Sequence, residues 1–425
     1  MKRTTKLALL GSAVVYGSVT SQSVKAGGLS LYELGTPDLG LASAGYAARA
    51  QDASTLYKNP AGMSLLRGSQ VQGGLQVLYA DVNFSPDANT SAGLGTDDGG
   101  NAVGLLPGMS LFYVQELGEK WRIGFGTFSN FGLAQEYDAN WIGRYYVQKS
   151  ALIGVSLMPS VSYQVNDWFS VGVGLNAMYG YLNNEVAINN VAPGFGDGLM
   201  KLNDSTWGFG ANVGLMFEPK KGTRIGVTYQ SAIDLDFEDT PTYSNLGPGL
   251  GGLLANPSTV NLGMTVPQSV MVGVYHELND KLALMADVGW QQWSRFGKVD
   301  VGVDSANPQS VTANLNYDDT WHAAVGAQYK LTDEWQLTGG IAYDSSAVSD
   351  ENRSVALPMG QMWRFGLGAL WQVSEKITLG AAYEFGWGGD MTVDQGSSPS
   401  LRGRVSGAWE NVAFNFFTLN MTWKF

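Results

Sequence analysis

Histidine is scarce in this chain, which limits the catalytic chemistry that it could support. Only His276 and His322 occur among the 425 residues, and Asp318 and Asp319 lie just before the second of them. A hydrolytic triad would need a serine beside a histidine and an acid. The sequence contains no Gly-x-Ser-x-Gly elbow that could present such a serine. We therefore predict that the chain is not an enzyme, and a hydrolase is only a weaker alternative.

Metal and cofactor chemistry finds equally little support in the sequence. The chain has no cysteine, which excludes a disulfide framework and a thiolate metal site. The run Asp97-Asp98-Gly99-Gly100 lacks the spaced acidic residues of a calcium loop. A net charge of −12 is opposite in sign to a nucleic-acid-binding surface. We expect no metal, no cofactor and no nucleic-acid partner.

Apolar and basic side chains suggest instead a site for a hydrophobic ligand. Two long connections carry apolar residues among glycines, which predicts a surface that captures such a ligand: Phe195, Leu199, Leu250, Leu253 and Leu254. Packing of these loops on one another explains the pattern equally well. If the ligand carries a carboxylate, Arg353 and Arg295 are the first candidates to contact it, followed by Arg144 and Lys149. The alternative is that these cations balance acids inside the protein.

The elements that would position these residues are β-strands. In the last segment, Phe417, Leu419, Met421, Trp423 and Phe425 alternate with polar residues. The same alternation recurs over residues 169–181, 282–290 and 377–387. A strand that separates lipid from a polar lumen needs this period of two. Repetition along the chain therefore indicates a transmembrane β-barrel.

Connections of two lengths support this interpretation. Short polar turns occur at residues 118–120, 166–167, 219–222, 279–281, 332–334 and 374–376. Longer connections lie near residues 86–103, 138–149, 191–203, 241–265, 303–317, 346–354 and 392–408. Short turns on one side and long loops on the other are typical of outer-membrane barrels. The fold class predicted is all-β, with about 14 antiparallel transmembrane strands over residues 68–425.

The first 67 residues do not follow the strand pattern. Lys2, Arg3 and Lys6, an apolar run and Val24-Lys25-Ala26 predict a signal peptide over residues 1–26. Residues 27–67 are rich in alanine and glycine, and Thr36-Pro37-Asp38 predicts a helix that runs to about Ala50. Asn59-Pro60-Ala61-Gly62 has the composition of a turn. We predict that residues 27–67 form an N-terminal hatch that plugs the lumen.

Several motifs together give a family resemblance over essentially the whole mature chain. They are Asp52-Ala53-Ser54-Thr55, Asn59-Pro60-Ala61-Gly62, Asn130-Phe131-Gly132-Leu133-Ala134, Trp207-Gly208-Phe209-Gly210, Trp293-Ser294-Arg295-Phe296, Gly340-Ile341-Ala342-Tyr343-Asp344 and Asn352-Arg353-Ser354. On these motifs the chain resembles the FadL-type long-chain fatty acid transporters, a family that also includes toluene uptake channels. The third outer loop, at about residues 191–203, is shorter than in the better-known fatty acid transporters, which leaves the substrate open.

The resemblance implies a monomeric barrel closed by a hatch, with a substrate exit through the wall beside a kinked third strand. Asn130, Phe131 and Gly132 fall at that kink by resemblance, and a glycine inside a strand suits a bulge or bend. The hatch motif Asn59, Pro60, Ala61 and Gly62 is either an anchor or a moving latch. Outer-membrane lipid and lipopolysaccharide are the expected surroundings.

The function predicted from the sequence is passive uptake of hydrophobic small molecules across the outer membrane of a Gram-negative cell. Long-chain fatty acids are the leading substrate, and aromatic hydrocarbons are the alternative within the same family. A general porin for hydrophilic solutes would fit the barrel equally well. The predicted hatch and the apolar outer loops argue against it, because neither serves a water-filled pore.

Overall fold

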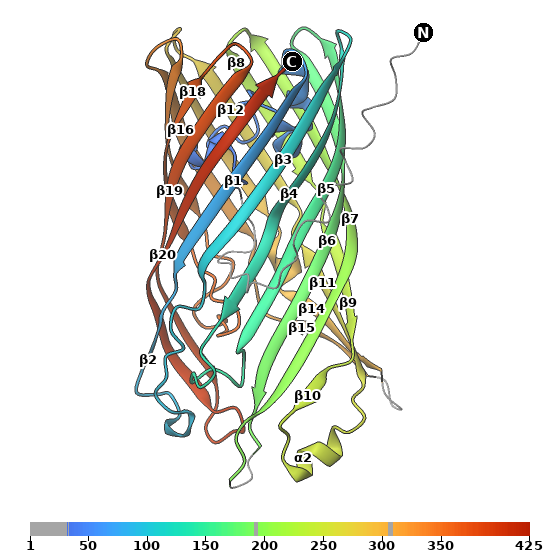
Figure 1. Ribbon diagram of the computed structural model, residues 1–425, viewed down its shortest axis with the longest axis vertical. Helices are drawn as coiled ribbons and strands as arrows, with labels where there is room; N and C mark the ends of the chain where they lie inside the picture. The colour runs from blue at the N-terminus through green and yellow to red at the C-terminus, as the bar shows by residue number, and fades with distance from the viewer. Residues whose placement is uncertain (1–31, 33, 191–193, 305–308) are drawn as a thin grey trace.

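The computed structural model describes residues 32, 34–190, 194–304 and 309–425 (Figure 1). The predicted signal peptide and the first residues of the predicted hatch lie outside this part of the chain. Strands make up most of the described residues. Among them, no helix is long and apolar enough to cross a membrane.

A closed antiparallel barrel of 14 strands forms the body of the molecule. Its strands are β1 (Gln70–Asp81), β3 (Gly104–Leu117), β4 (Trp121–Glu136), β5 (Lys149–Asn166), β6 (Phe169–Ile188), β7 (Gly198–Lys220), β8 (Thr223–Gln230), β12 (Ser269–Glu277), β13 (Leu282–Gln291), β16 (Thr320–Lys330), β17 (Trp335–Asp344), β18 (Met362–Gln372), β19 (Ile377–Gly396) and β20 (Arg404–Lys424). The first and last strands close the ring, with Gln70 opposite Lys424 and Asp81 opposite Ala413. The predicted fold class and strand number are confirmed.

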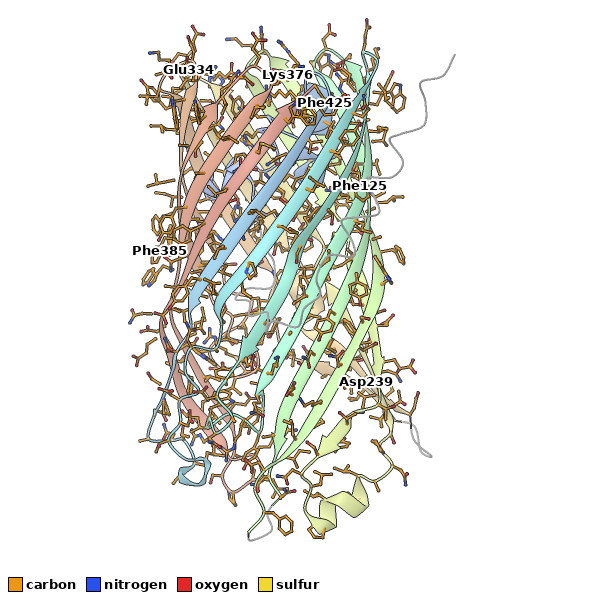
Figure 2. The ribbon with its side chains drawn as sticks, in the orientation of Figure 1. Phe125, Asp239, Glu334, Lys376, Phe385 and Phe425 are labelled. Atoms are coloured by element: carbon orange, nitrogen blue, oxygen red, sulfur yellow. The ribbon has the colours of Figure 1, made fainter. Side chains whose placement is uncertain are left out.

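Alternation along the strands separates the outer wall from the lumen. On β20, Leu419 is 65% exposed, whereas its neighbour Asn420 is 7% exposed. Phe125 and Phe385 lie on the outer wall at mid-height, while Glu334 and Lys376 mark the end with the short turns (Figure 2). The C-terminus lies at this same end, which is the periplasmic side of an outer-membrane barrel.

The opposite end of the barrel carries additional elements (Figure 1). They are β2 (Phe84–Pro86), η3 (Ala92–Leu94), β9 (Ile233–Asp239), β10 (Thr242–Ser244), α2 (Pro248–Leu253), β11 (Thr259–Val266), α3 (Trp293–Phe296), β14 (Lys298–Asp304) and β15 (Gln309–Asn314). β9, β11, β14 and β15 pair into a separate four-stranded sheet. They prolong β8, β12, β13 and β16 in the same order, after a break in each strand.

The structure corrects four of the predicted connections. The spans predicted as loops at residues 241–265 and 303–317 contain β10, α2, β11 and β15. The third outer loop ends where β7 begins at Gly198, and the connection predicted at residues 392–408 is shortened by the end of β19 at Gly396 and the start of β20 at Arg404. For the second, four-stranded sheet, the reason is an apolar face on β9: Ile233, Leu235 and Phe237 are buried against glycines on the lumen side of β6 and β7. Burial of that face stabilises β9, and β9 pairs with β11 inside the span predicted as a loop.

The segment before β1 lies inside the barrel as three short helices (Figure 1). They are η1 (Pro37–Leu41), α1 (Thr55–Lys58) and η2 (Pro60–Leu65). Nearly every residue from 34 to 64 is buried. The predicted helix to about Ala50 is wrong, because Ala42 and Ser43 have φ angles of 48° and 65°. These left-handed conformations end the helix after one turn.

Glycines on the lumen face of the wall make room for this segment. A Cβ atom at Gly226 would overlap the carbonyl of Ala47, and one at Gly340 would overlap the carbonyl of Leu41. At Gly172, a Cβ atom would collide with the backbone of Pro60 and Ala61. Glycine inside a strand therefore serves close backbone approach here.

Candidate functional site

Asn59 joins the N-terminal segment to the barrel wall. Its side chain is fully buried, and its amide nitrogen donates to the carbonyl of Ala47 at 2.8 Å and to that of Leu215 on β7 at 3.0 Å. Its amide oxygen accepts from the backbone N–H of Ala61 at 3.1 Å, which caps η2, and Pro60 occupies the first turn. The predicted hatch motif is therefore built into a joint between the segment and the wall.

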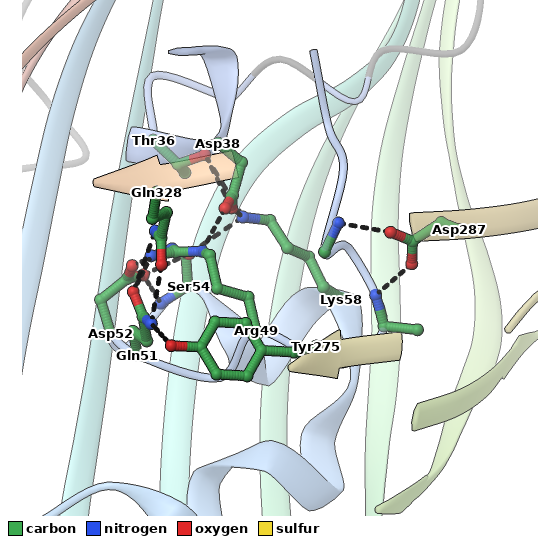
Figure 3. A network of polar contacts seen from close by, with 12 residues as sticks. Thr36, Asp38, Arg49, Gln51, Asp52, Ser54, Lys58, Tyr275, Asp287 and Gln328 are labelled. Carbon is green, nitrogen blue, oxygen red and sulfur yellow. Dashed lines mark hydrogen bonds and ion pairs between the residues drawn. The ribbon is translucent and has the colours of Figure 1, made fainter. Parts of the chain in front are cut away.

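A buried polar network holds the rest of the segment (Figure 3). Arg49 forms ion pairs with Asp38 and Asp52, and Lys58 forms one with Asp38. Two acids and two bases thus lie together in the lumen, where charges must be paired. Burial lowers the pKa of Lys58 to about 7, although its ammonium lies beside Asp38.

Two further contacts connect this network to the strands. The carboxylate of Asp287 on β13 accepts hydrogen bonds from the backbone N–H groups of Gly45 and Ala47, the latter at 3.1 Å. The amide nitrogen of Gln51 donates to the Tyr275 hydroxyl at 3.2 Å and to Gln328 at 2.9 Å. Charge-assisted bonds to a carboxylate are roughly twice as strong as neutral ones. Asp287 is therefore a main attachment point of the segment.

An irregularity in β4 coincides with the predicted kink of the third barrel strand. Phe128 pairs with Ser156 of β5, but the next ladder pair is Phe131 with Gly154, so the register shifts between them. Asn130 and Phe131 are buried. Gly132 follows the bulge directly and pairs with Ile153. The structure thus brings the three predicted kink residues together at one bulge, which bends its strand.

Along β4, the hydrogen-bonded ladder with β3 ends just before this bulge. Its last pair is Leu111 with Thr127, although both strands continue beyond it. The wall closes again where the backbone N–H of Glu136 donates to the carbonyl of Ala102 at 2.8 Å. Pro107 lies in the part of β3 that does not pair with β4, as expected for a residue confined to strand edges. The wall therefore has a break beside the bulge.

A partly open cavity lies between the bulge and the N-terminal segment. Tyr32, Tyr46 and Tyr57 of the segment line it, together with Asn130 and Phe131 of β4. Residues of β5, β6, β7, β8, β9, β11, β12 and β13 also contribute to its lining. Its volume is about 40 Å³, well below the roughly 300 Å³ of a site for a drug-sized ligand. An extended ligand can enter only if neighbouring side chains move.

The predicted capture residues lie at the far end of the barrel but do not share one environment. Phe195 is 51% exposed and Leu253, at the end of α2, is 80% exposed. Leu250 and Leu254 are half-buried, and Leu199 belongs to β7, where it pairs with Ser244 of β10. Leu253 and Phe195 are therefore the two members most available to a ligand.

The sequence matches one known protein family over almost its whole length. The model of the outer membrane protein transport proteins (OMPP1/FadL/TodX) matches residues 17–425. The chain belongs to this family. The predicted resemblance and the predicted location in the outer membrane are confirmed, and the family transports hydrophobic compounds.

Individual relatives match over nearly their whole length. Outer membrane protein P1 of Haemophilus influenzae is 28% identical over 461 residues, covering 98% of each chain. The long-chain fatty acid transport protein of Escherichia coli K12 is 24% identical, covering 90% of this chain and 93% of its own. Among solved structures, a FadL homologue of Pseudomonas aeruginosa has a TM-score of 0.83 at 23% identity, with 94% and 100% covered. The toluene transporter of Ralstonia pickettii has a TM-score of 0.66 at 20% identity, with 92% and 97% covered.

The arginines predicted to contact a carboxylate lie apart from the cavity of this family member. Arg353 is buried, pairs with Asp350 and donates to the carbonyls of Met359 and Thr392. Arg295 is half-exposed and lies 3.1 Å from Asp234. Of the two predicted second, Arg144 pairs with Asp197 and Lys149 with Glu136. All four cations therefore have an acidic partner.

The two histidines belong to separate places in the wall. His322 is buried on β16, and its Nδ1 lies 2.7 Å from Asp344, which also pairs with Arg364. Its other ring nitrogen has no hydrogen-bond partner among the described residues. His276 contacts Thr223 at 2.9 Å. Within the described ranges, no serine therefore completes a hydrolytic triad with this His–Asp pair, and known family members are transporters.

Sequence reasoning missed the lumen-facing residues that hold the N-terminal segment and line the cavity. Asp287 lies within the alternating segment 282–290 but carries no motif, and Asn176 and Gln230 carry none either. The available signal was polarity on the inward row of a membrane strand. That signal marks the lumen but does not say which lumen residue meets which.

Proposed function

We propose that this protein lets hydrophobic compounds diffuse passively from the cell exterior into the outer membrane, through the break in the wall between β3 and β4. Neither ATP nor a cofactor is needed, because consumption of the compound inside the cell maintains its gradient. The protein acts as a monomer surrounded by outer-membrane lipid and lipopolysaccharide.

The observation that carries this proposal is the end of the β3–β4 ladder beside the bulge of β4. An apolar compound that leaves through the wall enters lipid directly and never has to dissolve in water. Asn130 and Phe131 line both the bulge and the cavity. The lateral gate that we propose therefore adjoins the space in which a ligand would be held.

The buried N-terminal segment supports a closed channel. Its residues are buried inside the barrel, and the adjoining cavity is about 40 Å³. A water-filled pore for hydrophilic solutes would need a continuous open path. We propose that the segment is a hatch, anchored by Asn59 and Asp287, and that small movements of it contribute to gating.

A long-chain fatty acid is the substrate that we propose first, and a monoaromatic hydrocarbon is the second candidate. Relatives named for each of these substrates match the chain. The apolar loop residues Phe195 and Leu253 would capture either compound. A fatty acid carboxylate would meet its cation at Arg295, which is half-exposed, before Arg353, which is buried.

Uptake measurements test this proposal directly. A strain that lacks the protein should take up oleate or toluene more slowly than the same strain with the gene restored. In planar bilayers the purified protein should carry little ionic current. A large steady current would contradict the closed channel and would favour a general porin.

A further inference from the structure

We infer that the cavity binds the uncharged, hydroxyl-bearing head of an amphiphile, such as a long-chain alcohol, a phenol or a fatty acid in its protonated form. The inference deepens the proposed function and rests on it, because it assumes that the transported compound occupies this cavity.

The first observation is the chemistry of the lining. No acidic, basic or histidine residue lines the cavity in the part of the chain that the structure describes. Its polar groups are neutral: three tyrosines and the side chains of Asn130, Asn176, Asn212, Gln230, Ser231, Ser269 and Gln291. A carboxylate buried there would lose its hydration without gaining a cation, which costs several kcal/mol or more. A neutral head group avoids this cost.

The second observation is an unpaired amide in the lining. The side-chain oxygen of Asn176, on β6, is shielded from solvent and accepts no hydrogen bond from the described residues. Its neighbours in the cavity are better satisfied. Gln291 donates to the Tyr32 hydroxyl at 2.8 Å, and Gln230 donates to the Tyr46 hydroxyl at 3.1 Å. Because buried polar atoms are nearly always paired, Asn176 is the position where a ligand group is needed.

A hydroxyl group fits this position better than a carboxylate. It donates to the amide oxygen of Asn176, and it also accepts, so that it serves either orientation of the amide. An ionised carboxylate has no proton to donate. The volume of about 40 Å³ holds a few water molecules or one hydroxymethyl group. The cavity therefore accommodates a head group in the present conformation.

The apolar side of the cavity gives the direction of the tail. Phe131, Met178, Ile233 and Val266 line the cavity and also belong to the buried apolar cluster beneath the second sheet. A tail that extends along Phe131 passes the bulge of β4 and reaches the break in the wall. The head at Asn176 and the tail at Phe131 then define one orientation of the ligand.

Titration calorimetry with decanol, decanoic acid and decane tests the inference on the purified full-length protein. At about pH 8, where the acid is ionised, decanol should bind roughly tenfold more tightly than decanoate. At about pH 4.5 the difference should shrink, because much of the acid is protonated. Equal binding of decanol, decanoate and decane at about pH 8 would overturn the inference but leave the proposed function intact. No binding of any of the three would count against the proposed function itself.

Variants of Asn176 separate a ligand contact from a water site. Asn176→Leu should weaken decanol binding about tenfold and leave decane binding unchanged. Asn183→Leu on the same strand, outside the cavity, is the matched control. Asn176→Asp keeps an acceptor for the hydroxyl, so decanol should still bind while decanoate binds more weakly at about pH 8. If Asn176→Leu bound decanol as tightly as the wild type, only water would occupy this position and the inference would fail.

Discussion

The side-chain amide of Asn59 donates a hydrogen bond to the backbone carbonyl of Leu215 across 3.0 Å, which links the lumen segment directly to strand β7. The same nitrogen also donates to the backbone carbonyl of Ala47. One side chain therefore connects two parts of the segment to each other and to the barrel wall. A buried amide with all these partners is costly to replace, because each lost bond leaves an unpaired backbone group.

Asn59→Asp should loosen the segment. The substitution keeps the shape but removes two donors and buries a charge, which destabilises the packed segment by about 2 kcal/mol or more. Amide hydrogen exchange of residues Pro37–Leu65 should accelerate, and ionic current through planar bilayers should rise. Asn89→Asp, at an exposed position in an outer connection, is the control. Unchanged exchange would mean that Asn59 does not anchor the segment.

Packing of the segment should also depend on pH through Lys58. Burial lowers the pKa of Lys58 to about 7, whereas a lysine in the unfolded chain has a pKa of about 10.4. Below about pH 7, Lys58 is protonated in both the folded and the unfolded chain. Between about pH 7 and 10, it is protonated only in the unfolded chain, so the stability of the folded state rises with pH. The gain should be roughly 1 kcal/mol from pH 7 to 8.

Hydrogen exchange of residues Pro37–Leu65, corrected for its intrinsic dependence on pH, measures this gain. Protection should increase from about pH 7 to 8 in the wild type. Lys58→Met should remove the increase, while Lys376→Met, at an exposed turn, should retain it. Protection that does not change between about pH 7 and 8 would show that the ion pair with Asp38 offsets burial and keeps Lys58 protonated in the folded state.

The parts of the fold that were predicted from the sequence are those with a local signal. The outward row Phe417, Leu419, Met421 and Trp423 is visible because period-two alternation needs only neighbouring residues. The second sheet was missed because the burial of Leu235 depends on Gly180 and Gly208, which are distant in sequence. Such close packing leaves no pattern that one sequence can reveal.

In the candidate site, too, the features with a local sequence signal were predicted and those that depend on distant residues were not. The bulge at Asn130 and the turn at Asn59 carry motifs and were predicted. The early end of the helix at Ala42 was not, since its left-handed φ occurs where the Ala42 backbone packs closely against Gly366 of β18. Nor was the pairing of Asp287 with Gly45, which joins residues more than 200 positions apart. Contacts of this kind arise only once the barrel has closed.

The apolar residues at the end of α2 should contribute to ligand capture. Leu253→Ser together with Leu254→Ser removes apolar surface and should weaken binding of a long-chain ligand about tenfold. Barrel assembly, followed by the shift in electrophoretic mobility on boiling, should not change. Leu401→Ser, at a residue that is 66% exposed in another connection, is the matched control. Equal affinity of the double variant and the wild type would show that the loops pack as a lid without binding ligand.

Joining β3 to β4 across the break should stop transport. If the register of Leu111 with Thr127 continued, Met109 would face Ser129. Because the chain has no cysteine, Met109→Cys with Ser129→Cys can be linked by a short bifunctional thiol reagent without side reactions. Substrate uptake should fall at least about tenfold after cross-linking, since the proposed route for the ligand is then blocked.

The same strands provide the control for this experiment. Tyr113 and Phe125 are partners within the intact part of the ladder, so Tyr113→Cys with Phe125→Cys joins β3 to β4 without touching the break. Cross-linking of this pair should leave uptake unchanged, because the two strands are already held together there by hydrogen bonds. A disulfide-forming version of the Met109 and Ser129 pair should recover uptake after reduction. Undiminished uptake by fully cross-linked Met109 and Ser129 variants would show that the ligand leaves the barrel elsewhere.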